Sequence, residues 1–381
     1  MPIRIVHVIT SLISGGAETS LLRLLSHYDR EKFPSTVIAL DGDGAIAHRI
    51  QSLGVEVVDL KMRRGRIPSP IALLALVRHL RRLRPGLVQS WMYHADLMAT
   101  LAVPLARGPK LLWNVRCSEL NVGPGPTQPR SLVRLLAALS RRPTAVIVNS
   151  HAGLQYHASC GYRPQRWEVI PNGFDLEQFR VDLAARAAIR AELGLWSEVP
   201  LIGLVARWDP IKDHRMFFEA ARLLLRQLPD VQFLLAGENM TVSNPTLSGW
   251  IEELGLLDHI HLLGERSDIP RVTAALDIAS LTSFAEGFPN VVGEAMSCAV
   301  PCVVTDVGDV RWMVGDTGRV LDARDPAALA AAWCDVLALP ANERAALGMR
   351  ARNRINELLT IGKAIASYES LYETVGVPSN A

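Results

Sequence analysis

The sequence contains little cysteine and no long uncharged apolar segment. Its five cysteines are scattered along the chain as Cys117, Cys160, Cys298, Cys302 and Cys334. Because they form no C-x-x-C pair, they fit neither a zinc site nor a disulfide framework, and we expect reduced thiols. No apolar run reaches about 18 residues, so no membrane-spanning helix is predicted. The segment MPIRIVHVIT alternates like a strand rather than resembling a signal peptide, and a cytoplasmic protein is expected.

The composition is that of an ordinary globular protein. The chain has 381 residues, of which 49% are hydrophobic and 20% are charged. These values exclude a disordered or collagen-like chain. The length suggests two domains, each with its own core.

Apolar strands and amphipathic helices alternate along the chain, which predicts α/β domains with parallel sheets. Strands are expected at 3–9, 35–40, 55–59, 86–90, 110–115 and 144–149, and again at 201–206, 231–236, 260–263, 277–281 and 301–304. Helices are expected at 17–29, 44–52, 69–83, 95–106, 130–141, 212–228, 247–254 and 290–298. The pattern pauses at 161–180, a segment rich in Pro, Gly and Asn. We therefore predict two Rossmann-like, doubly wound domains facing a central cleft, with ligands beyond the carboxyl ends of the strands.

Acidic residues are scarce between Lys61 and Arg142. This segment holds fifteen basic residues and only two acids, Asp96 and Glu119. Such an excess predicts a surface that attracts anions. A solvated basic face, a nucleic-acid surface and an anionic membrane are the alternatives, but no nucleic-acid-binding motif accompanies the charge. Residues 127–142 and 68–84 combine arginines with an apolar helical face, which suits either contact with anionic lipid or burial against the sheet.

Two glycines, Gly15 and Gly16, follow the first predicted strand and precede the first helix. Glycine lets a backbone approach a ligand closely, and a helix N-terminus favours anions. Asp41 stands where a dinucleotide-binding fold places its ribose-binding acid, but the loop lacks the G-x-G-x-x-G spacing. The DGDG segment at 41–44 could hold a divalent ion, although a surface turn that caps a helix is the simpler interpretation.

Two further groups follow predicted strands. His94 comes just after the strand at 86–90, where it could donate or accept a proton or serve packing alone. Arg207 and Lys212 lie in the loop after the strand at 201–206. Together they suit a diphosphate, and the alternative is a pair of solvated surface cations.

Residues 283–306 form the segment richest in candidate ligand-binding groups. Glu286 lies before a helix predicted to begin near Asn290, and Glu294 lies about one turn into it. Carboxylates accept hydrogen bonds from vicinal hydroxyls, as in sugars and ribose. The N–H groups at the helix start could receive phosphate or sugar oxygens. Acids near a helix N-terminus are also favourable for the helix alone, so the spacing by itself leaves both interpretations open.

Four segments, taken together and in order, carry a family resemblance. They are GGAE at 15–18, VIPNGFD at 169–175, ARWDPIKDH at 206–214 and EGFPNVVGEAMSCAVPCVVTDVGD at 286–309. This set resembles the retaining glycosyltransferases of the GT-B fold that carry an E-x7-E motif, often called group 1 glycosyltransferases. The similarity extends over nearly the whole chain, and the E-x7-E segment is its most specific part.

The resemblance implies a donor site built from both domains. Gly15 and Gly16 would approach the donor diphosphate from the first domain. Arg207 and Lys212 would neutralise the leaving diphosphate and so take part in catalysis.

The E-x7-E segment would bind the rest of the donor. Glu286 would bind the hydroxyls of the donor sugar at the catalytic centre, and Glu294 would hold the nucleotide ribose. Four residues would lie along the sugar and phosphates, partly through backbone groups: Phe288, Pro289, Asn290 and Val291.

On the acceptor side, the resemblance places a catalytic histidine, His94, and an arginine, Arg116. It also implies that the last helix crosses back onto the first domain. The expected domains are therefore residues 1–172 plus a C-terminal helix at about 362–381, and residues 173–361.

The resemblance implies retaining transfer of a sugar from a nucleoside diphosphate sugar, with a UDP-sugar favoured and GDP-mannose as the other candidate. The acceptor would be a hydroxyl of a glycan or a lipid-linked glycan in exopolysaccharide, lipopolysaccharide or capsule synthesis. No metal cofactor is expected, because cations of the protein would neutralise the diphosphate. No nucleic-acid partner is expected, and the 61–142 segment suggests peripheral contact with the inner face of a membrane. The alternatives are a non-catalytic nucleotide-sugar-binding subunit and a GT-B-fold epimerase.

Overall fold

The computed structural model describes residues 2–13, 15–62, 69–117, 130–322 and 324–376. These residues divide into two compact units. Unit 1 combines the chain up to Asn172 with the chain from Gly362 onward, and unit 2 consists of Gly173–Ile361. Each unit is described by itself.

Unit 1 contains a seven-stranded parallel sheet with the order β3-β2-β1-β4-β5-β6-β7. Its strands are β1 (Ile5–Ser11), β2 (Ser35–Asp41), β3 (Glu56–Asp59), β4 (Leu87–Trp91), β5 (Lys110–Val115), β6 (Ala145–Val148) and β7 (Trp167–Val169). The strand order reverses between β1 and β4, which pair in parallel with Ile9 opposite Trp91. The loops after β1 and β4 therefore lie side by side at the carboxyl edge, where such sheets bind ligands.

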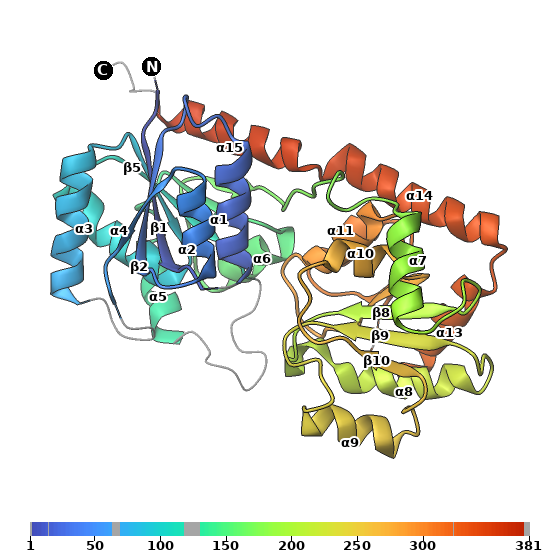
Figure 1. The fold of residues 1–381 in the computed structure, drawn as a ribbon. Helices are drawn as coiled ribbons and strands as arrows, with labels where there is room; N and C mark the ends of the chain where they lie inside the picture. The colour runs from blue at the N-terminus through green and yellow to red at the C-terminus, as the bar shows by residue number, and fades with distance from the viewer. Residues whose placement is uncertain (1, 14, 63–68, 118–129, 323, 377–381) are drawn as a thin grey trace. The chain divides into compact units, whose positions relative to one another are not determined.

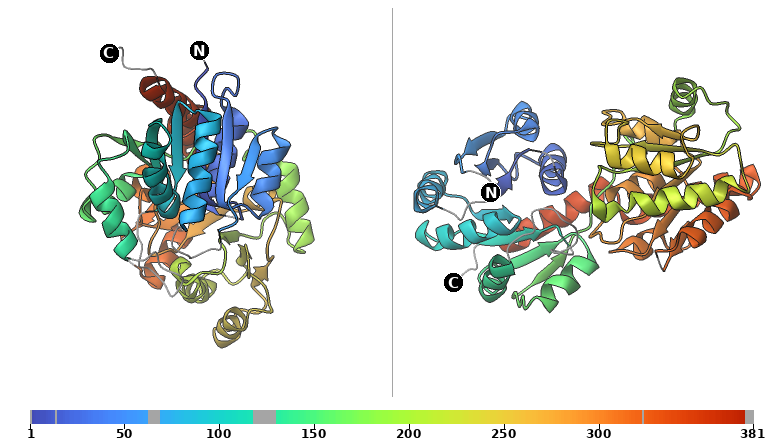
Figure 2. Two further views of the ribbon diagram at one scale, coloured as in Figure 1. Left: turned by 90° about the vertical axis from the view of Figure 1, so that its left-hand side faces the viewer. Right: turned by 90° about the horizontal axis from the view of Figure 1, so that it is seen from below.

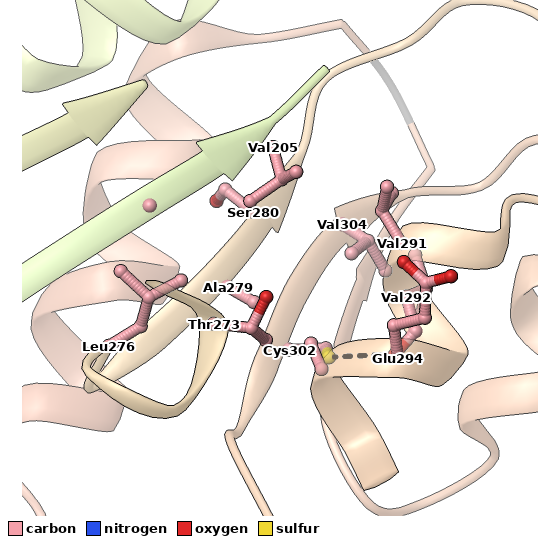
Figure 3. Close-up of a pocket in the computed structure, with 12 residues that line it drawn as sticks. Val205, Thr273, Leu276, Ala279, Ser280, Val291, Val292, Glu294, Cys302 and Val304 are labelled. Carbon is pink, nitrogen blue, oxygen red and sulfur yellow. Dashed lines mark hydrogen bonds between the residues drawn. The ribbon is translucent and has the colours of Figure 1, made fainter. Parts of the chain in front are cut away.

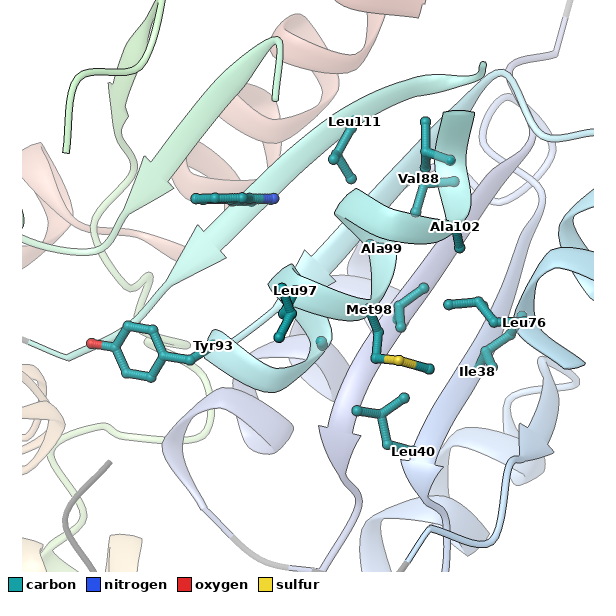
Figure 4. Close-up of a cluster of buried hydrophobic side chains, with 14 of the residues drawn as sticks. Ile38, Leu40, Leu76, Val88, Tyr93, Leu97, Met98, Ala99, Ala102 and Leu111 are labelled. Atoms are coloured by element: carbon teal, nitrogen blue, oxygen red, sulfur yellow. The ribbon is translucent and has the colours of Figure 1, made fainter. Parts of the chain in front are cut away.

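Helices cover both faces of this sheet (Figure 1). One face carries α3 (Pro70–Leu83), α4 (Tyr93–Leu105) and α5 (Arg130–Leu139), and α6 (His151–Ser159) packs on β6 and β7. The other carries α1 (Gly16–His27), α2 (Ala45–Ser52) and α15 (Ile361–Gly376). Figure 4 shows Leu76 of α3 and Met98 of α4 packed between these helices and the strands, beside Ile38. Burial of this apolar surface is the main force that holds the helices on the sheet.

The C-terminal helix α15 is fixed to the unit 1 sheet by buried tyrosines. The Tyr372 hydroxyl donates to Oε1 of Gln89 at 2.5 Å, and Nδ2 of Asn114 donates to the Tyr368 hydroxyl at 2.9 Å. These bonds satisfy polar groups on two central strands that would otherwise be buried without partners. Helix α15 is thus an integral layer of unit 1.

Unit 2 contains a six-stranded parallel sheet with the order β10-β9-β8-β11-β12-β13. Its strands are β8 (Leu201–Val205), β9 (Gln232–Ala236), β10 (Ile260–Leu262), β11 (Ile278–Leu281), β12 (Cys302–Thr305) and β13 (Arg319–Leu321). Its helices are α7 (Leu183–Glu192), the 3-10 turn η1 (Pro210–Lys212), α8 (His214–Leu225), α9 (Pro245–Glu253), α10 (Ile269–Ala274), α11 (Asn290–Ser297), α12 (Val310–Val314), α13 (Pro326–Leu337) and α14 (Ala341–Leu358). Separate apolar clusters fill the two sides of the sheet.

The predicted fold class is confirmed, since both units are parallel α/β layers of the Rossmann type. No strand or helix was predicted within 161–180, but the edge strand β7 lies in this segment. Three residues are too few to show an apolar alternation. The cleft expected between the domains stays a prediction. Within the described ranges, no helix is both long and apolar enough to cross a bilayer.

Candidate functional site

The topology of unit 2 brings two of the predicted ligand-binding loops together. Strand β8 lies between β9 and β11, so the order reverses here. The loop after β8 carries Arg207 and Lys212, and the loop after β11 carries Glu286. Because the paired strands are parallel, both loops leave the same edge of the sheet.

Lys212 and Glu286 form the centre of the site. The ammonium of Lys212 makes an ion pair with Oε1 of Glu286, and the two side chains are only 16% and 15% exposed. Ser283 donates its hydroxyl to the same Glu286 oxygen at 2.8 Å. Thr282 donates to the backbone carbonyl of Lys212 at 2.7 Å. A cation and a carboxylate are thus held side by side by hydroxyl groups of the β11 loop, which the sequence did not single out.

Gly308 supports the backbone around Glu286. It has a φ of 57°, and a Cβ at this position would lie 2.4 Å from the carbonyl oxygens of both Glu286 and Gly287. The Asp309 N–H also donates to the Gly287 carbonyl at 3.2 Å. A side chain at position 308 would therefore displace the Glu286 loop. This role could have been suspected only from the VGD sequence after β12.

Helix α11 begins at Asn290 with Pro289 in its N-cap position. The Phe288 ring is buried and stacks on Phe174 with the ring centres 6.2 Å apart, so its side chain serves packing. Gly293 lets the helix approach the same ring, because a Cβ there would lie 2.0 Å from the Phe174 ring tip. These contacts hold the first turn of α11, in which Val291 is half-buried, against the Phe174 ring.

Glu294 lies one turn into α11 and is half-buried. It lines a narrow pocket whose other walls are mostly apolar (Figure 3). Val205 at the end of β8 and Val304 of β12 are among them. Burial, together with the nearby charge of Glu294, raises the pKa of the Cys298 thiol to about 12, so this thiol stays protonated.

Arg207 is the most exposed of the predicted donor-site cations. Its guanidinium donates to Asp209 at 2.6 Å, and its side chain is 60% exposed. Asp209 in turn accepts a hydrogen bond from the Ile211 N–H at 3.1 Å and caps η1. Arg207 is thus tethered to the loop that presents Lys212.

In unit 1, Gly15, Gly16 and His94 lie after the adjacent strands β1 and β4. Gly16 is the first residue of α1, and a Cβ there would meet no atom within 4 Å. Packing within the described part of unit 1 therefore does not require a glycine at position 16. His94 is the second residue of α4, and partial burial lowers its pKa below 6.5. The imidazole is consequently neutral at pH 7 and can act as a hydrogen-bond donor and acceptor.

Arg116 at the end of β5 has structural partners. It donates to the Tyr368 hydroxyl at 3.2 Å and also to Oδ1 of Asn172. Its guanidinium lies 5.8 Å from the centre of the Trp91 ring. Arg116 therefore links the sheet, α15 and the end of the first segment of unit 1, and its role toward an acceptor stays a prediction.

The DGDG segment forms a turn in which Asp59 accepts the Gly42 N–H at 2.8 Å, and Gly44 occupies the N-cap position of α2. In the part of the chain that the structure describes, no three His, Cys, Asp or Glu side chains gather as a metal site would require.

Comparison with known proteins identifies the family. The model of glycosyl transferases group 1 matches residues 199–338, and that of glycosyltransferase family 4 matches residues 14–178. The chain belongs to the group 1 glycosyltransferases. The two matches cover the whole sheet of unit 2 and the sheet of unit 1 except for β1, and they include the Lys212–Glu286 pair and His94.

Two curated relatives illustrate how this family member compares with named enzymes. It is 30% identical over 295 residues to a D-inositol 3-phosphate glycosyltransferase of Mycolicibacterium vanbaalenii, a match that covers 71% of this chain and 64% of that protein. It is 31% identical over 153 residues to the Escherichia coli UDP-Gal:alpha-D-GlcNAc-diphosphoundecaprenol alpha-1,3-galactosyltransferase, covering 40% of this chain and 39% of that one. The chain thus spans less than two thirds of the length of either relative.

Solved structures of the GT-B fold match nearly the whole chain. Anabaena HepE in complex with UDP and glucose aligns with a TM-score of 0.82 and 22% identity, covering 98% of this chain and 100% of that one. Sucrose-phosphate synthase of Thermosynechococcus elongatus aligns with a TM-score of 0.78 and 19% identity over 98% and 99% of the two chains. These similarities establish the GT-B fold.

Proposed function

We propose that the protein transfers a sugar from a nucleoside diphosphate sugar to a hydroxyl group of a glycan or a lipid-linked glycan. The observation that carries this proposal is the Lys212–Glu286 pair, held by Ser283 beside the start of α11 at the strand-order reversal of unit 2. A cation beside a carboxylate suits a ligand with a diphosphate next to a polyhydroxylated ring.

A UDP-sugar is the donor that we favour. The Escherichia coli relative is named for UDP-Gal as its donor, and HepE, which shares the fold, was solved with UDP and glucose. The same relative is named for an acceptor on diphosphoundecaprenol, which supports a lipid-linked acceptor. GDP-mannose remains the second donor to test, and assembly of an exopolysaccharide, lipopolysaccharide or capsule is the corresponding process.

The chemistry proposed for the site follows from its charges. Lys212, Arg207 and the first N–H groups of α11 stabilise the negative charge that develops on the departing diphosphate. Glu286 accepts hydrogen bonds from hydroxyls of the donor sugar, and Glu294 accepts those of the ribose. Neutral His94 orients groups at the acceptor side. With these cations in place, we propose that transfer needs no metal ion, so that a chelator leaves turnover unchanged.

We further propose that the anomeric configuration is retained. The acceptor hydroxyl attacks from the face that the diphosphate leaves, and its proton passes to the departing phosphate oxygen. No side chain is assigned as a covalent nucleophile. A glycosyl-enzyme adduct trapped on any side chain would overturn this account, and an inverted product would overturn retention.

The deciding experiment measures donor binding and turnover separately. Thermal unfolding is followed with UDP, GDP and their sugars for the wild type, Glu294→Ala and the exposed control Glu252→Ala. A ligand at about 100 times its dissociation constant should stabilise the fold by roughly 2.7 kcal/mol. We expect a uridine-specific shift that Glu294→Ala loses and Glu252→Ala keeps, together with glycosylated product when an acceptor is supplied.

Other outcomes separate the alternatives. Donor binding without any turnover would indicate a non-catalytic subunit. A changed sugar nucleotide formed without acceptor would indicate an epimerase. No stabilisation by any sugar nucleotide would contradict the proposal.

A further inference from the structure

Helices α3, α4 and α5 present an unusual outward surface on unit 1. They lie side by side on one face of the sheet, as the left panel of Figure 2 shows, and α4 contacts both neighbours. Their sequences contain one acidic residue, Asp96, which is completely buried. The outer side of this row, here called the α3–α5 face, therefore exposes no carboxylate from its own helices.

Large apolar side chains are exposed on the same helices. Their exposed fractions run from 43% to 81%, and they are Ile71, Leu74, Leu101, Leu105 and Leu135. In the described part of unit 1, the only other exposed large apolar residue is Ile13, which lies outside these three helices. Exposed apolar residues gathered on one surface mark a contact site more often than scattered ones do.

Cations accompany these residues at one end of the α3–α5 face. An open hollow at the amino ends of β4 and β5 is lined by Arg81, Arg84, Arg107 and Lys110. Lys110 also lines a second hollow, together with Arg142 before β6. Among the described residues, no acidic one lines either hollow. Lys110 thus lines both hollows, and the five cations together are here called the cationic rim.

The rim and the apolar residues adjoin each other. The Arg81 guanidinium donates two hydrogen bonds to the Leu105 carbonyl, at 3.0 and 2.8 Å. The end of α3 is thereby tied to the end of α4, where the Leu105 side chain is exposed. Arg81 is held by a neutral carbonyl, so its charge is not compensated there.

We propose that the α3–α5 face docks on the surface of a bilayer that contains anionic phospholipids. Leucine and isoleucine side chains would enter the acyl boundary, and the arginines and Lys110 would contact lipid phosphates. A bilayer surface offers negative charge and apolar depth together, which matches the composition of this face. The inference does not depend on the transferase proposal, although α4 also carries His94 at its other end.

A second copy of the chain fits this face less well. A two-fold dimer places the same patch on both sides of the interface. The cationic rims would then share one interface without an acid from these helices to separate them. A nucleic acid would satisfy the cations but leave the exposed leucines and isoleucine unused.

The test is co-sedimentation of the full-length protein with vesicles, without any sugar nucleotide or acceptor. Vesicles of phosphatidylcholine alone are compared with vesicles that also contain phosphatidylglycerol. We expect binding only to the anionic vesicles, and its loss in about 1 M salt, where the Debye length falls to about 3 Å. Because donor and acceptor are absent, failure here would leave the transferase proposal standing.

Two variants and one control locate the contact. The triple variant Arg84→Gln, Arg107→Gln, Lys110→Gln should weaken binding about 100-fold, at roughly fivefold per cation. The double variant Leu101→Ser, Leu105→Ser should weaken it about tenfold without a change of charge. The control Arg226→Gln, Arg319→Gln, Arg350→Gln removes three exposed cations from unit 2 and should bind like the wild type.

Three results would overturn the proposal. One is the absence of binding to anionic vesicles at low salt. Another is an equal loss in the control, which would show that charge alone drives binding. The third is a wild-type dimer, seen by light scattering, that Leu101→Ser, Leu105→Ser dissociates while vesicle binding is unchanged, which would assign the face to a second copy.

Discussion

The two units share a sheet topology but treat charge differently. In both, the strand order runs outward from a central pair, β1 with β4 and β8 with β11. In unit 2, Asp277, whose side chain is 11% exposed, lies between two arginines, Arg186 and Arg190, at 2.6 Å each. Unit 1 buries Asp96 with a hydroxyl partner, Ser90 at 2.6 Å. The two units thus share a fold, but unit 2 pairs its largely buried carboxylate with two cations, whereas unit 1 holds its buried carboxylate with a hydroxyl group.

The two units also differ in how many of their charged side chains form ion pairs. Among the residues that the structure describes, three ion pairs lie in unit 1 and twelve in unit 2. The charges of unit 2 largely compensate each other, and the Lys212–Glu286 pair belongs to that set. In unit 1, exposed cations such as Arg84, Arg107 and Lys110 take part in none of the three pairs, which leaves them available for an external anion.

The largest expected effect concerns the two buried carboxylates. Asp277→Asn leaves two guanidinium groups facing each other without their carboxylate, so we expect it to lower the free energy of unfolding by about 3–5 kcal/mol. Burial raises the pKa of Asp96 well above its usual value. Its partner is the Ser90 hydroxyl, so Asp96→Asn leaves no guanidinium without its carboxylate and should cost less than about 1 kcal/mol. Urea unfolding of both variants checks this. Equal losses in the free energy of unfolding would show that Asp277 and Asp96 contribute equally to stability, which would contradict the comparison.

The next effect separates the chemical roles of the units. Lys212→Ala removes the cation beside Glu286 and should lower turnover by about 10²–10³-fold and weaken UDP binding. His94→Ala should lower turnover while leaving UDP binding unchanged, because its proposed role is at the acceptor side. Calorimetric titration with UDP and a turnover assay are the two measurements, with Arg226→Ala as the surface control. Unaltered UDP binding in Lys212→Ala would remove Lys212 from the donor site.

Glycines in helices of the two units offer a third comparison. Gly293→Ala would force a methyl group into the Phe174 ring, so a loss of about 1–3 kcal/mol is expected. At Gly16 an added methyl group meets nothing, so Gly16→Ala should leave the melting temperature close to that of the wild type and reduce only turnover. Gly249→Ala, in open space on α9, is the stability control for unit 2. A stable Gly293→Ala would mean that Phe174 can move aside.

The smallest effect is a pH dependence of unit 2. Burial, helped by the charge of Lys212, lowers the pKa of His214 to about 3, and neither ring nitrogen has a hydrogen-bond partner among the described residues. Below pH 6.5 the His214 imidazole binds a proton in the unfolded chain but not in the folded protein. The free energy of unfolding therefore falls as the pH drops. Between pH 7.5 and 5.5 the wild type should lose about 1.4 kcal/mol more than His214→Phe. The same loss in both proteins would contradict the burial of a neutral imidazole.

The sequence predicted the parallel sheets because buried strands and amphipathic helices leave strong periodic signals. Each of the strands β8, β9 and β11 lies within three residues of its expected range. The sequence pattern did not predict β13, which has only three residues. It also did not predict helix α7. Helices α13 and α14 lie beyond the last element that the pattern identified. Local composition resembles a loop when an element has few residues to bury.

For the site, the sequence indicated which residues carry the chemistry, but not which of them touch. Glu286, Lys212 and the start of α11 were selected from their types and from the family resemblance. The hydroxyl of Ser283 and the close approach of Gly308 depend on loops that are distant along the chain. Arg116 was selected for an acceptor role, yet its observed contacts are with Tyr368 and Asn172.

By itself, the sequence determined the fold class, the family and the excess of positive charge in the first half of the chain. The tertiary structure decided that Lys212 meets Glu286, that Asp96 is buried while arginines around it stay exposed, and that five apolar side chains face outward on three adjacent helices. The physical reason is that periodicity and charge are properties of local sequence. Pairing and exposure depend on which surfaces the packed sheets and helices leave in contact or in water.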